Sequence, residues 1–346
     1  MGAEVAAGNR WRRWWPWLGG LVGLAALAWV FGRLDYARLR EVLANADAFY
    51  LLTVPLAIAA EQAVRAWKWR QILYALRPVG TFRLFGVIMA GYLAGMLVPG
   101  GSPLLRSWLV AQLERLRMSA VLATVAIDRL IDGIVFTAFV AAVLAFAAFP
   151  DPDGKLRLGL VIAGAGSFAL FALLLALLVR YRRDVVDQAS WIMRLAARLP
   201  ARFVERGRAL LRSFAQGVVW PAEPWRRLAI VLASVVIKLI AATHFLWAGL
   251  AFGVVLRPVE YIFLIVFLGF IVILTHFARI AGGFIVGAVF ALGLFGVEAE
   301  QAVAMTFVVQ VASLATVAGI GAFALWRHGF TLGDLRRAEG AGVRGG

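Results

Sequence analysis

The residues best able to do chemistry in this sequence are charged side chains that interrupt apolar segments. The richest group is Asp128, Arg129 and Asp132, inside the apolar stretch 119–150. Asp128 and Asp132 are four residues apart and so share one face of a helix, and Arg129 is three before Asp132 and can pair with it. Two interpretations stay open. Arg129 holds a phosphate while the aspartates orient it or carry a proton, or the group is a neutral ion pair that locks helices together.

Two further sets of charges follow a pattern. Glu61, Arg65 and Lys68 are separated by four and then three residues, which places them along one stripe of a helix. Arg106 follows a proline- and glycine-rich break, and Arg279 precedes a second break. An arginine at such a break suits bidentate phosphate binding, or else extends to the nearby membrane surface. We favour binding for Arg106 and leave both interpretations open for Arg65 and Arg279.

The composition indicates the solvent in which these charges sit. Hydrophobic residues make up 63% of the 346 residues and charged residues 16%, with a mean hydropathy of +0.86. A soluble domain has about 45–50% apolar and about 25% charged residues. A globule of this size cannot hide so much apolar surface, so we expect a membrane protein. With no cysteine and three scattered histidines, we expect no disulfide, no metal site and no cofactor.

Uncharged windows separated by short polar loops predict the transmembrane segments. They must be helical, because lipid offers no partner to an unpaired backbone amide. We therefore predict an all-α, polytopic transmembrane bundle that forms a single membrane domain over 1–346. The windows are Trp14–Gly32, Ala48–Ala60, Leu84–Leu105, Gly133–Pro150, Leu158–Val179, Leu239–Leu256, Tyr261–Ala278, Ile280–Val297 and Gln301–Trp326.

Charge placement predicts the orientation. The net charge of +16 lies mainly in loops, which favours contact with anionic lipid over nucleic acid. Residues 65–83 form one basic loop, and 180–227 form a basic, amphipathic linker on the cytoplasmic leaflet. The positive-inside rule then places both termini in the cytoplasm. We prefer an uncleaved first helix at Trp14–Gly32 to a signal peptide cleaved near Ala26-Leu27-Ala28.

An internal repeat gives the bundle its organisation. Leu76-Arg77-Pro78-Val79 recurs as Leu256-Arg257-Pro258-Val259, and each copy is followed by an apolar run and a break. The halves, about 48–150 and about 228–326, start on opposite sides of the membrane, which is typical of alternating-access transporters. We therefore predict an inverted repeat with two re-entrant helical hairpins rather than ordinary tight turns. The residues of the two breaks are Pro99, Gly100, Gly101, Gly282 and Gly283.

Three stretches resemble the lysylphosphatidylglycerol synthase transmembrane region, also described as a flippase-like family. They are residues 61–70, then Val98-Pro99-Gly100-Gly101 with Arg106 after it, then Ser119 through Asp132. The resemblance covers roughly 15–326. It implies re-entrant helices and the translocation of aminoacylated or other charged lipids. The soluble synthase domain of the full-length relatives would follow the membrane part, and this sequence runs only twenty residues past Trp326, so synthase activity is not implied.

The sequence departs from the family pattern at the breaks. The family tends to have a glutamate soon after each Pro-Gly break, where this sequence has Ser102-Pro103-Leu104-Leu105 and Val286-Gly287-Ala288. Ala281 replaces the usual proline of the second break, and Gln310 stands where an arginine is often found. A cationic headgroup would need the missing acids to bind it. These departures therefore argue against a cationic headgroup as the substrate.

We therefore expect a lipid translocase of the bacterial inner membrane that acts on membrane lipids and does not bind nucleic acid. An alternative is a non-catalytic scaffold that docks a lipid- or hopanoid-modifying enzyme through 180–227. A membrane-embedded enzyme would have only the Asp128 and Asp132 pair as a catalytic site, and we expect none. The predicted headgroup-binding residues are Arg106, Arg129, Asp128, Asp132, Glu61, Arg65 and Arg279.

Overall fold

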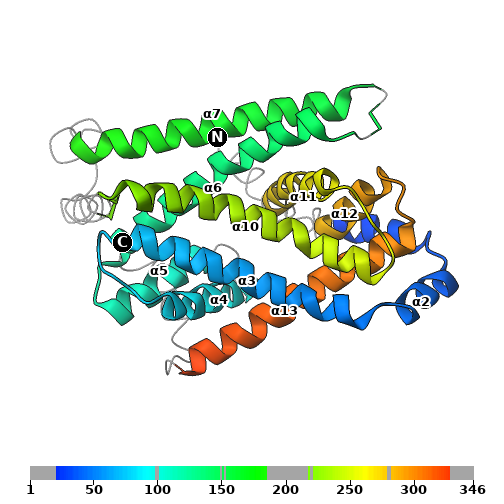
Figure 1. Cartoon of the computed structure of the whole chain (residues 1–346), viewed down its shortest axis with the longest axis horizontal. Coiled ribbons are helices and arrows are strands. Elements are labelled where there is room, and N and C mark those ends of the chain that lie inside the picture. Colours follow the sequence, from blue (N-terminus) through cyan, green and yellow to red (C-terminus); the bar gives the residue numbers. More distant parts are fainter. Residues whose placement is uncertain are drawn as a thin grey trace, which may run out of the picture. The chain divides into compact units, whose positions relative to one another are not determined.

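The computed structural model describes residues 21–97, 101–148, 150–151, 153–184, 217–218, 221–278 and 282–327 (Figure 1). These residues form helices joined by short loops, and they contain no β-strand. After a helical segment at Leu21–Phe31, the helices are α2 Tyr36–Ala44, α3 Ala48–Leu73, α4 Thr81–Leu97, α5 Gly101–Glu114, α6 Met118–Phe146, α7 Lys155–Asp184, α10 Pro224–Ala251, α11 Pro258–Ala278, α12 Gly283–Gly293 and α13 Ala299–Arg327. The predicted helical fold class is confirmed.

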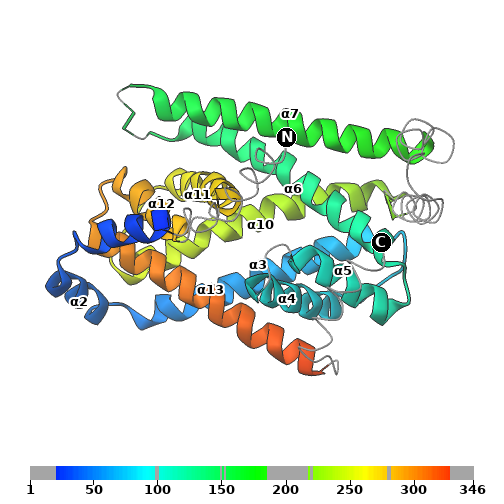
Figure 2. The same ribbon diagram turned by 180° about the vertical axis from the view of Figure 1, so that it is seen from behind.

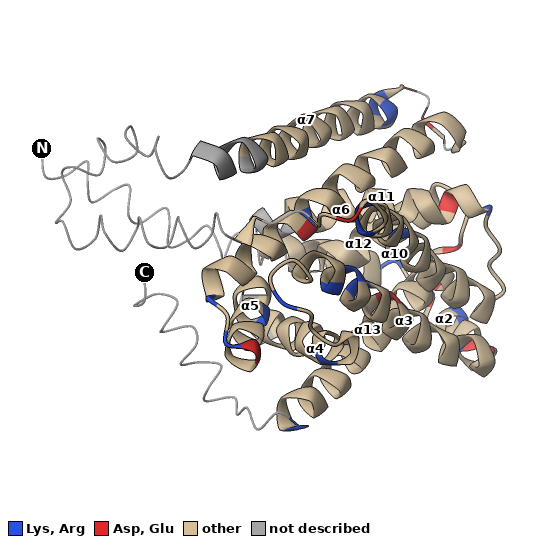
Figure 3. Cartoon of the chain, turned by 60° about the vertical axis from the view of Figure 1, so that its left-hand side comes forward, with Lys and Arg blue, Asp and Glu red and all other residues tan. Residues whose placement is uncertain are grey.

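Four helices are long and apolar enough to cross a membrane, namely α6, α7 as far as Leu177, α10 and α13. The bent pair of α2 and α3, which meet at 84°, adds a fifth candidate span. α7 has no charge between Arg157 and Arg180, and Figure 3 shows it in the colour of uncharged residues over most of its length. Only 11% of its apolar window is buried inside the protein. An exposed apolar surface of this kind is expected to contact the hydrocarbon of a bilayer.

The chain divides into two compact units. Unit 1 comprises 1–57, 139–161 and 241–312, and unit 2 comprises 58–138, 162–240 and 313–346. Each unit contains one pair of packed helices joined at a predicted break: α11 with α12 in unit 1, and α4 with α5 in unit 2. The members of each pair lie side by side in both views of the ribbon (Figures 1 and 2).

Within unit 2, glycines bring α4 close to its neighbours. A Cβ atom on Gly91 would lie 3.2 Å from Cβ of Arg106, and one on Gly95 would lie 3.0 Å from Cβ of Ser102. On α13, a Cβ atom on Gly321 would lie 2.7 Å from the backbone oxygen of Met89. α4 therefore packs backbone to backbone, which small residues permit within membranes.

Within unit 1, the second break is fixed by a left-handed glycine. Gly282, with φ of +72°, is the N-cap of α12, and Gly283 begins that helix. The Leu27 side chain lies directly against Gly282, so a Cβ atom at this position would clash with it. Aromatic rings fill the interior beside α12, where Phe263 contacts Phe267 and Phe295 at ring-centroid distances of 5.7 and 5.2 Å.

The helices after the two predicted breaks are short, as expected for re-entrant hairpins. α5 has 14 residues and α12 has 11, which correspond to about 21 and about 16 Å against a hydrocarbon core of about 30 Å. Gly101 begins α5. Pro99 and Gly100 lie outside the described residues, as do most of the predicted linker 180–227 and the first residues of the predicted helix Trp14–Gly32.

The predicted basic loop 65–83 is wrong in part. α3 continues to Leu73, so Arg65, Lys68 and Arg70 are helical, and the first two are buried. The sequence offered no acid within this stretch, but the acids come from elsewhere in the fold. Glu114, at the end of α5, pairs with Arg77 at 3.3 Å and with Arg83. A second difference is α2, a helix capped by Asp35 in a segment predicted to be a loop.

The close approach of α13 to α4 predicts a difference between two neighbouring glycines. Gly321→Ala places a methyl group against the Met89 carbonyl, so we expect overpacking to destabilise the protein by about 1–3 kcal/mol. Gly319→Ala is the matched control, because a Cβ atom there meets nothing within 4 Å and the better helix propensity of alanine adds about 1 kcal/mol. Thermal unfolding of the purified protein in detergent measures both variants. Equal melting temperatures for the two would contradict the packing of α13 on α4.

Candidate functional site

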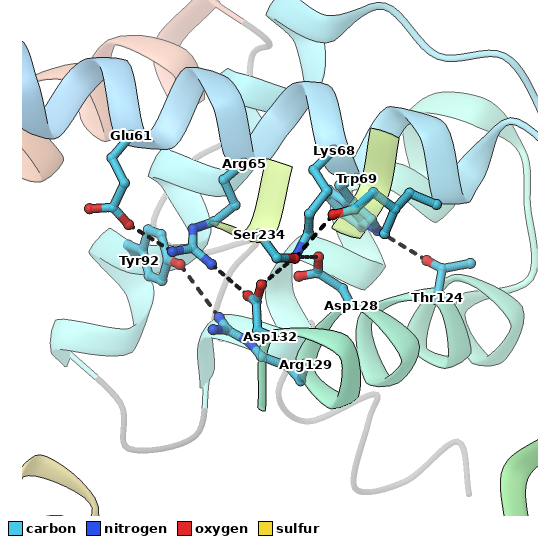
Figure 4. Close-up of polar contacts among 11 residues, drawn as sticks. Glu61, Arg65, Lys68, Trp69, Tyr92, Thr124, Asp128, Arg129, Asp132 and Ser234 are labelled. Carbon is cyan, nitrogen blue, oxygen red and sulfur yellow. Dashed lines mark hydrogen bonds and ion pairs between the residues drawn. The ribbon is translucent and has the colours of Figure 1, made fainter. Parts of the chain in front are cut away.

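Unit 2 buries a cluster of charged side chains that we call the ion cluster (Figure 4). It consists of Glu61, Arg65 and Lys68 on α3 and Asp128 and Asp132 on α6, each at most 8% exposed. The predicted helical stripe is confirmed for α3, and the predicted shared face is confirmed for the two aspartates, since both contact Lys68. Charges this deep are tolerated only in pairs.

Lys68 is the centre of the ion cluster. Its Nζ atom lies 2.6 Å from Oδ1 of Asp132, 2.7 Å from Oδ1 of Asp128 and 3.1 Å from Oγ of Ser234 on α10. The contact with Asp128 is an ion pair without hydrogen-bond geometry. An ammonium group has three donors. α3 carries Lys68, and α6 and α10 supply the oxygen atoms around its ammonium group. Lys68 therefore ties α3, α6 and α10 together inside unit 2.

Arg65 bridges the remaining acids of the ion cluster. Its Nη2 atom lies 2.7 Å from Oε1 of Glu61, and its Nη1 atom lies 3.1 Å from Oδ2 of Asp132. The two cations and three carboxylates of the ion cluster sum to −1. Lys238 on α10 lies over the ring of Phe136 on α6, with Nζ 5.4 Å from the ring centroid. Each carboxylate of the ion cluster lies beside a cation of the same cluster.

Two arginines of unit 2, Arg106 and Arg129, form no ion pair with the acids of the ion cluster. Arg106 on α5 is 1% exposed, and its Nε and Nη2 atoms have no hydrogen-bond partner among the described residues. Its guanidinium faces the ring of Trp69 at 5.4 Å from the centroid, and Trp69 in turn donates a hydrogen bond to Thr124 at 3.0 Å. A buried guanidinium without an acceptor is costly unless an anion binds to it.

Arg129 is the second surplus cation. It projects to the exposed side of α6 and donates a hydrogen bond of 3.4 Å to the hydroxyl of Tyr92 on α4. Tyr92 directly follows Gly91, where a Cβ atom would lie 3.2 Å from Cβ of Arg106, so Arg129 and Arg106 both approach this part of α4. Two like charges held together in this way raise the local affinity for an anion.

The pair of Arg129 with Asp132 that the sequence allowed is not among the ion pairs of the described residues. Asp132 faces α3, where Arg65 and Lys68 already bind both of its oxygens. Arg129, one residue after Asp128, points away from that side and reaches Tyr92 instead. Helical spacing made the pair possible, but the cations of a neighbouring helix competed for the same carboxylate.

Several residues of the site did not stand out in the sequence. Tyr92 and Ser234 are each flanked by apolar residues in their helices, and nothing in their spacing marks them. Lys68 was assigned to the α3 stripe but not to the binding set, although its place seven residues after Glu61 put it on the correct face. Arg279, a predicted headgroup-binding residue, lies outside the described residues.

The fold and the buried charges define a polytopic helical membrane protein with an ion cluster inside its second unit. The chain belongs to the family described as the lysylphosphatidylglycerol synthase TM region, whose model matches residues 17–321. This membership implies a membrane function related to lipids. Neither a curated protein nor a solved structure matches the chain.

Removing the central cation of the ion cluster gives a clear expectation. Lys68→Met leaves Asp128 and Asp132 short of a buried partner, and breaking a buried ion pair in this way costs about 3–5 kcal/mol. The control is Lys155→Met, which removes a lysine with an 82% exposed side chain from its pair with Asp153 and should change stability by less than about 1 kcal/mol. Chemical denaturation in detergent compares the variants. If Lys68→Met is as stable as Lys155→Met, Lys68 does not hold the helices together.

Proposed function

We propose that the protein is a lipid translocase in which Arg106 and Arg129 bind an anionic headgroup and carry it between leaflets. The observation that supports this most is Arg106, a nearly fully buried guanidinium whose Nε and Nη2 atoms lack any acceptor among the described residues. A guanidinium in this state is a preformed site for a carboxylate or phosphate.

The surroundings of Arg106 favour transport over a chemical reaction. The carboxylates of the ion cluster each lie beside a cation, so they suit the positioning of helices better than the removal of a proton from a substrate. Family membership adds the association with lipids. We therefore propose that the chain moves a lipid and does not convert it.

The paired short helices supply a route for the headgroup in this proposal. α4 with α5 and α11 with α12 each pack as a hairpin, and α5 and α12 are too short to span the membrane alone. Broken helices at matching places in two repeats are typical of transporters that bind substrate near the middle of the membrane. We place the protein in the bacterial inner membrane with both termini in the cytoplasm, as the positive-inside rule predicts.

A proteoliposome assay tests the proposal. Phosphatidic acid and phosphatidylglycerol, each labelled on an acyl chain, are reconstituted separately with the protein, and the label exposed in the outer leaflet is quenched over time. We expect flipping of at least one lipid to be accelerated by the wild type. Arg106→Ala and Arg129→Ala should each slow it about tenfold or more, because each removes a charge-assisted hydrogen bond.

The matched control is Arg40→Ala, which removes an exposed arginine for which no contact is recorded in the described part of the chain. It should flip both lipids at the wild-type rate. Unchanged flipping in monodisperse Arg106→Ala and Arg129→Ala would show that these residues do not bind the headgroup. No acceleration by the wild type over empty liposomes would reject the translocase itself.

A further inference from the structure

A second orphaned polar group lies beside Arg106 on α5. The Oγ atom of Ser102 is buried and, like Nε and Nη2 of Arg106, has no hydrogen-bond partner among the residues described. Ser102 and Arg106 are four residues apart and so lie on one face of the helix. Three polar atoms on a single face of α5 are therefore unsatisfied, whereas buried polar groups in proteins nearly always find a partner.

The face of α5 that carries Ser102 and Arg106 packs closely against α4. A Cβ atom on Gly91 would lie 3.2 Å from Cβ of Arg106 and 3.3 Å from the backbone oxygen of Ser102. A Cβ atom on Gly95 would lie 3.0 Å from Cβ of Ser102. Both side chains thus leave α5 where glycines of α4 make room for them, so neither is free to turn to bulk solvent.

A neighbouring serine shows that the unsatisfied state of Ser102 is particular to its position. The hydroxyl of Ser107, also on α5, donates a hydrogen bond of 2.7 Å to the backbone oxygen of Pro103. A serine inside a helix commonly makes this bond to the preceding turn. Ser102 is in the first turn of α5, which begins at Gly101. α5 itself therefore supplies no carbonyl four residues before Ser102 for this bond.

The donors of Arg106 are arranged for one particular type of acceptor. Nε and Nη2 lie on the same edge of the planar guanidinium, so together they match two oxygens of one phosphate or carboxylate. Ser102 adds a neutral hydroxyl donor on the same face. The free amides in the first turn of a helix also favour an anion.

The two arginines select among such anions by their charge. Neither Arg106 nor Arg129 forms an ion pair with an acid among the described residues, whereas the acids of the ion cluster are paired with Arg65 and Lys68, so two positive charges are left for a ligand to balance. A phosphodiester headgroup such as that of phosphatidylglycerol carries one negative charge. A phosphomonoester carries about −1.5 to −2 at pH 7 and has three terminal oxygens that accept hydrogen bonds. The monoester matches both the excess charge and the number of donors.

We propose that Ser102, Arg106 and Arg129 form a binding site for the phosphomonoester headgroup of a lipid. In this site the Nε and Nη2 atoms of Arg106 donate to two phosphate oxygens, the Ser102 hydroxyl donates to an oxygen, and Arg129 neutralises the second charge. This inference rests on the proposed function for the nature of the ligand and adds Ser102 and the class of headgroup. Equilibrium binding tests it separately from transport.

The experiment measures binding of defined lipids to the full chain in nanodiscs of phosphatidylcholine. Phosphatidic acid is the monoester probe and phosphatidylglycerol the diester probe, and bound lipid is counted by native mass spectrometry at pH 7.5. We expect phosphatidic acid to bind about tenfold more tightly, which corresponds to about 1.4 kcal/mol, because its headgroup accepts one additional charge-assisted hydrogen bond. Inorganic phosphate is added in a third arm to compete with the lipid.

Variants then assign the binding to individual residues. Ser102→Ala should weaken phosphatidic acid binding about two- to tenfold, as expected for one neutral hydrogen bond. Ser107→Ala is its matched control and should bind normally, because its hydroxyl is already satisfied by Pro103. Arg106→Lys keeps the charge but loses the two-donor edge, and should bind phosphatidic acid more weakly than the wild type while remaining folded.

Three results would overturn the proposal. Equal binding of phosphatidic acid and phosphatidylglycerol would reject the monoester class, and equal effects of Ser102→Ala and Ser107→Ala would remove Ser102 from the site. Displacement of the lipid by inorganic phosphate at a concentration equal to that of the lipid would identify free phosphate as the ligand. Binding as expected without any flipping in proteoliposomes would instead reject translocation and leave the site intact.

Discussion

The contact of Lys68 with two aspartates is the interaction on which unit 2 depends. A fully buried ammonium group is far too costly to stand alone, and each aspartate beside it would be equally costly without it. Ser234 extends the contact from α3 and α6 to α10. The need to keep these charges together helps to fix the register of the three helices.

The acids of the ion cluster are already paired with Arg65 and Lys68, so they are not partners for Arg106 and Arg129. If Arg106 were paired with an acid, the buried charges would serve only to hold the helices together. Instead Arg65 and Lys68 occupy the acids, and Arg106 is left facing the ring of Trp69. A cation–π contact offsets only part of the cost of burying a guanidinium, so an anion is the natural complement.

The two hairpins follow a similar order along the sequence but differ in their interiors. α5 carries a serine and an arginine with free donors on one face, whereas α12 has no charged residue and lies among phenylalanine rings, with Phe284 near Phe245 and Phe290 near Phe267. Polar donors suit a headgroup, and rings suit hydrocarbon. The repeat in the sequence therefore does not imply two equivalent binding sites, and within the described parts of the two hairpins the unsatisfied donors lie on α5.

The sequence by itself determined the helical membrane fold, because the number and length of its apolar windows leave lipid as the only adequate solvent. Helical periodicity also determined that Glu61 lies beside Arg65 and that Asp128 and Asp132 share a face. Only the tertiary structure decided which charges pair, since Arg129 competes for Asp132 with cations of α3 that lie 64 and 67 residues away along the chain. For the same reason, only packing between helices could reveal that Ser102 and Arg106 keep unsatisfied donors, because satisfaction depends on which atoms of other helices come within 3.5 Å.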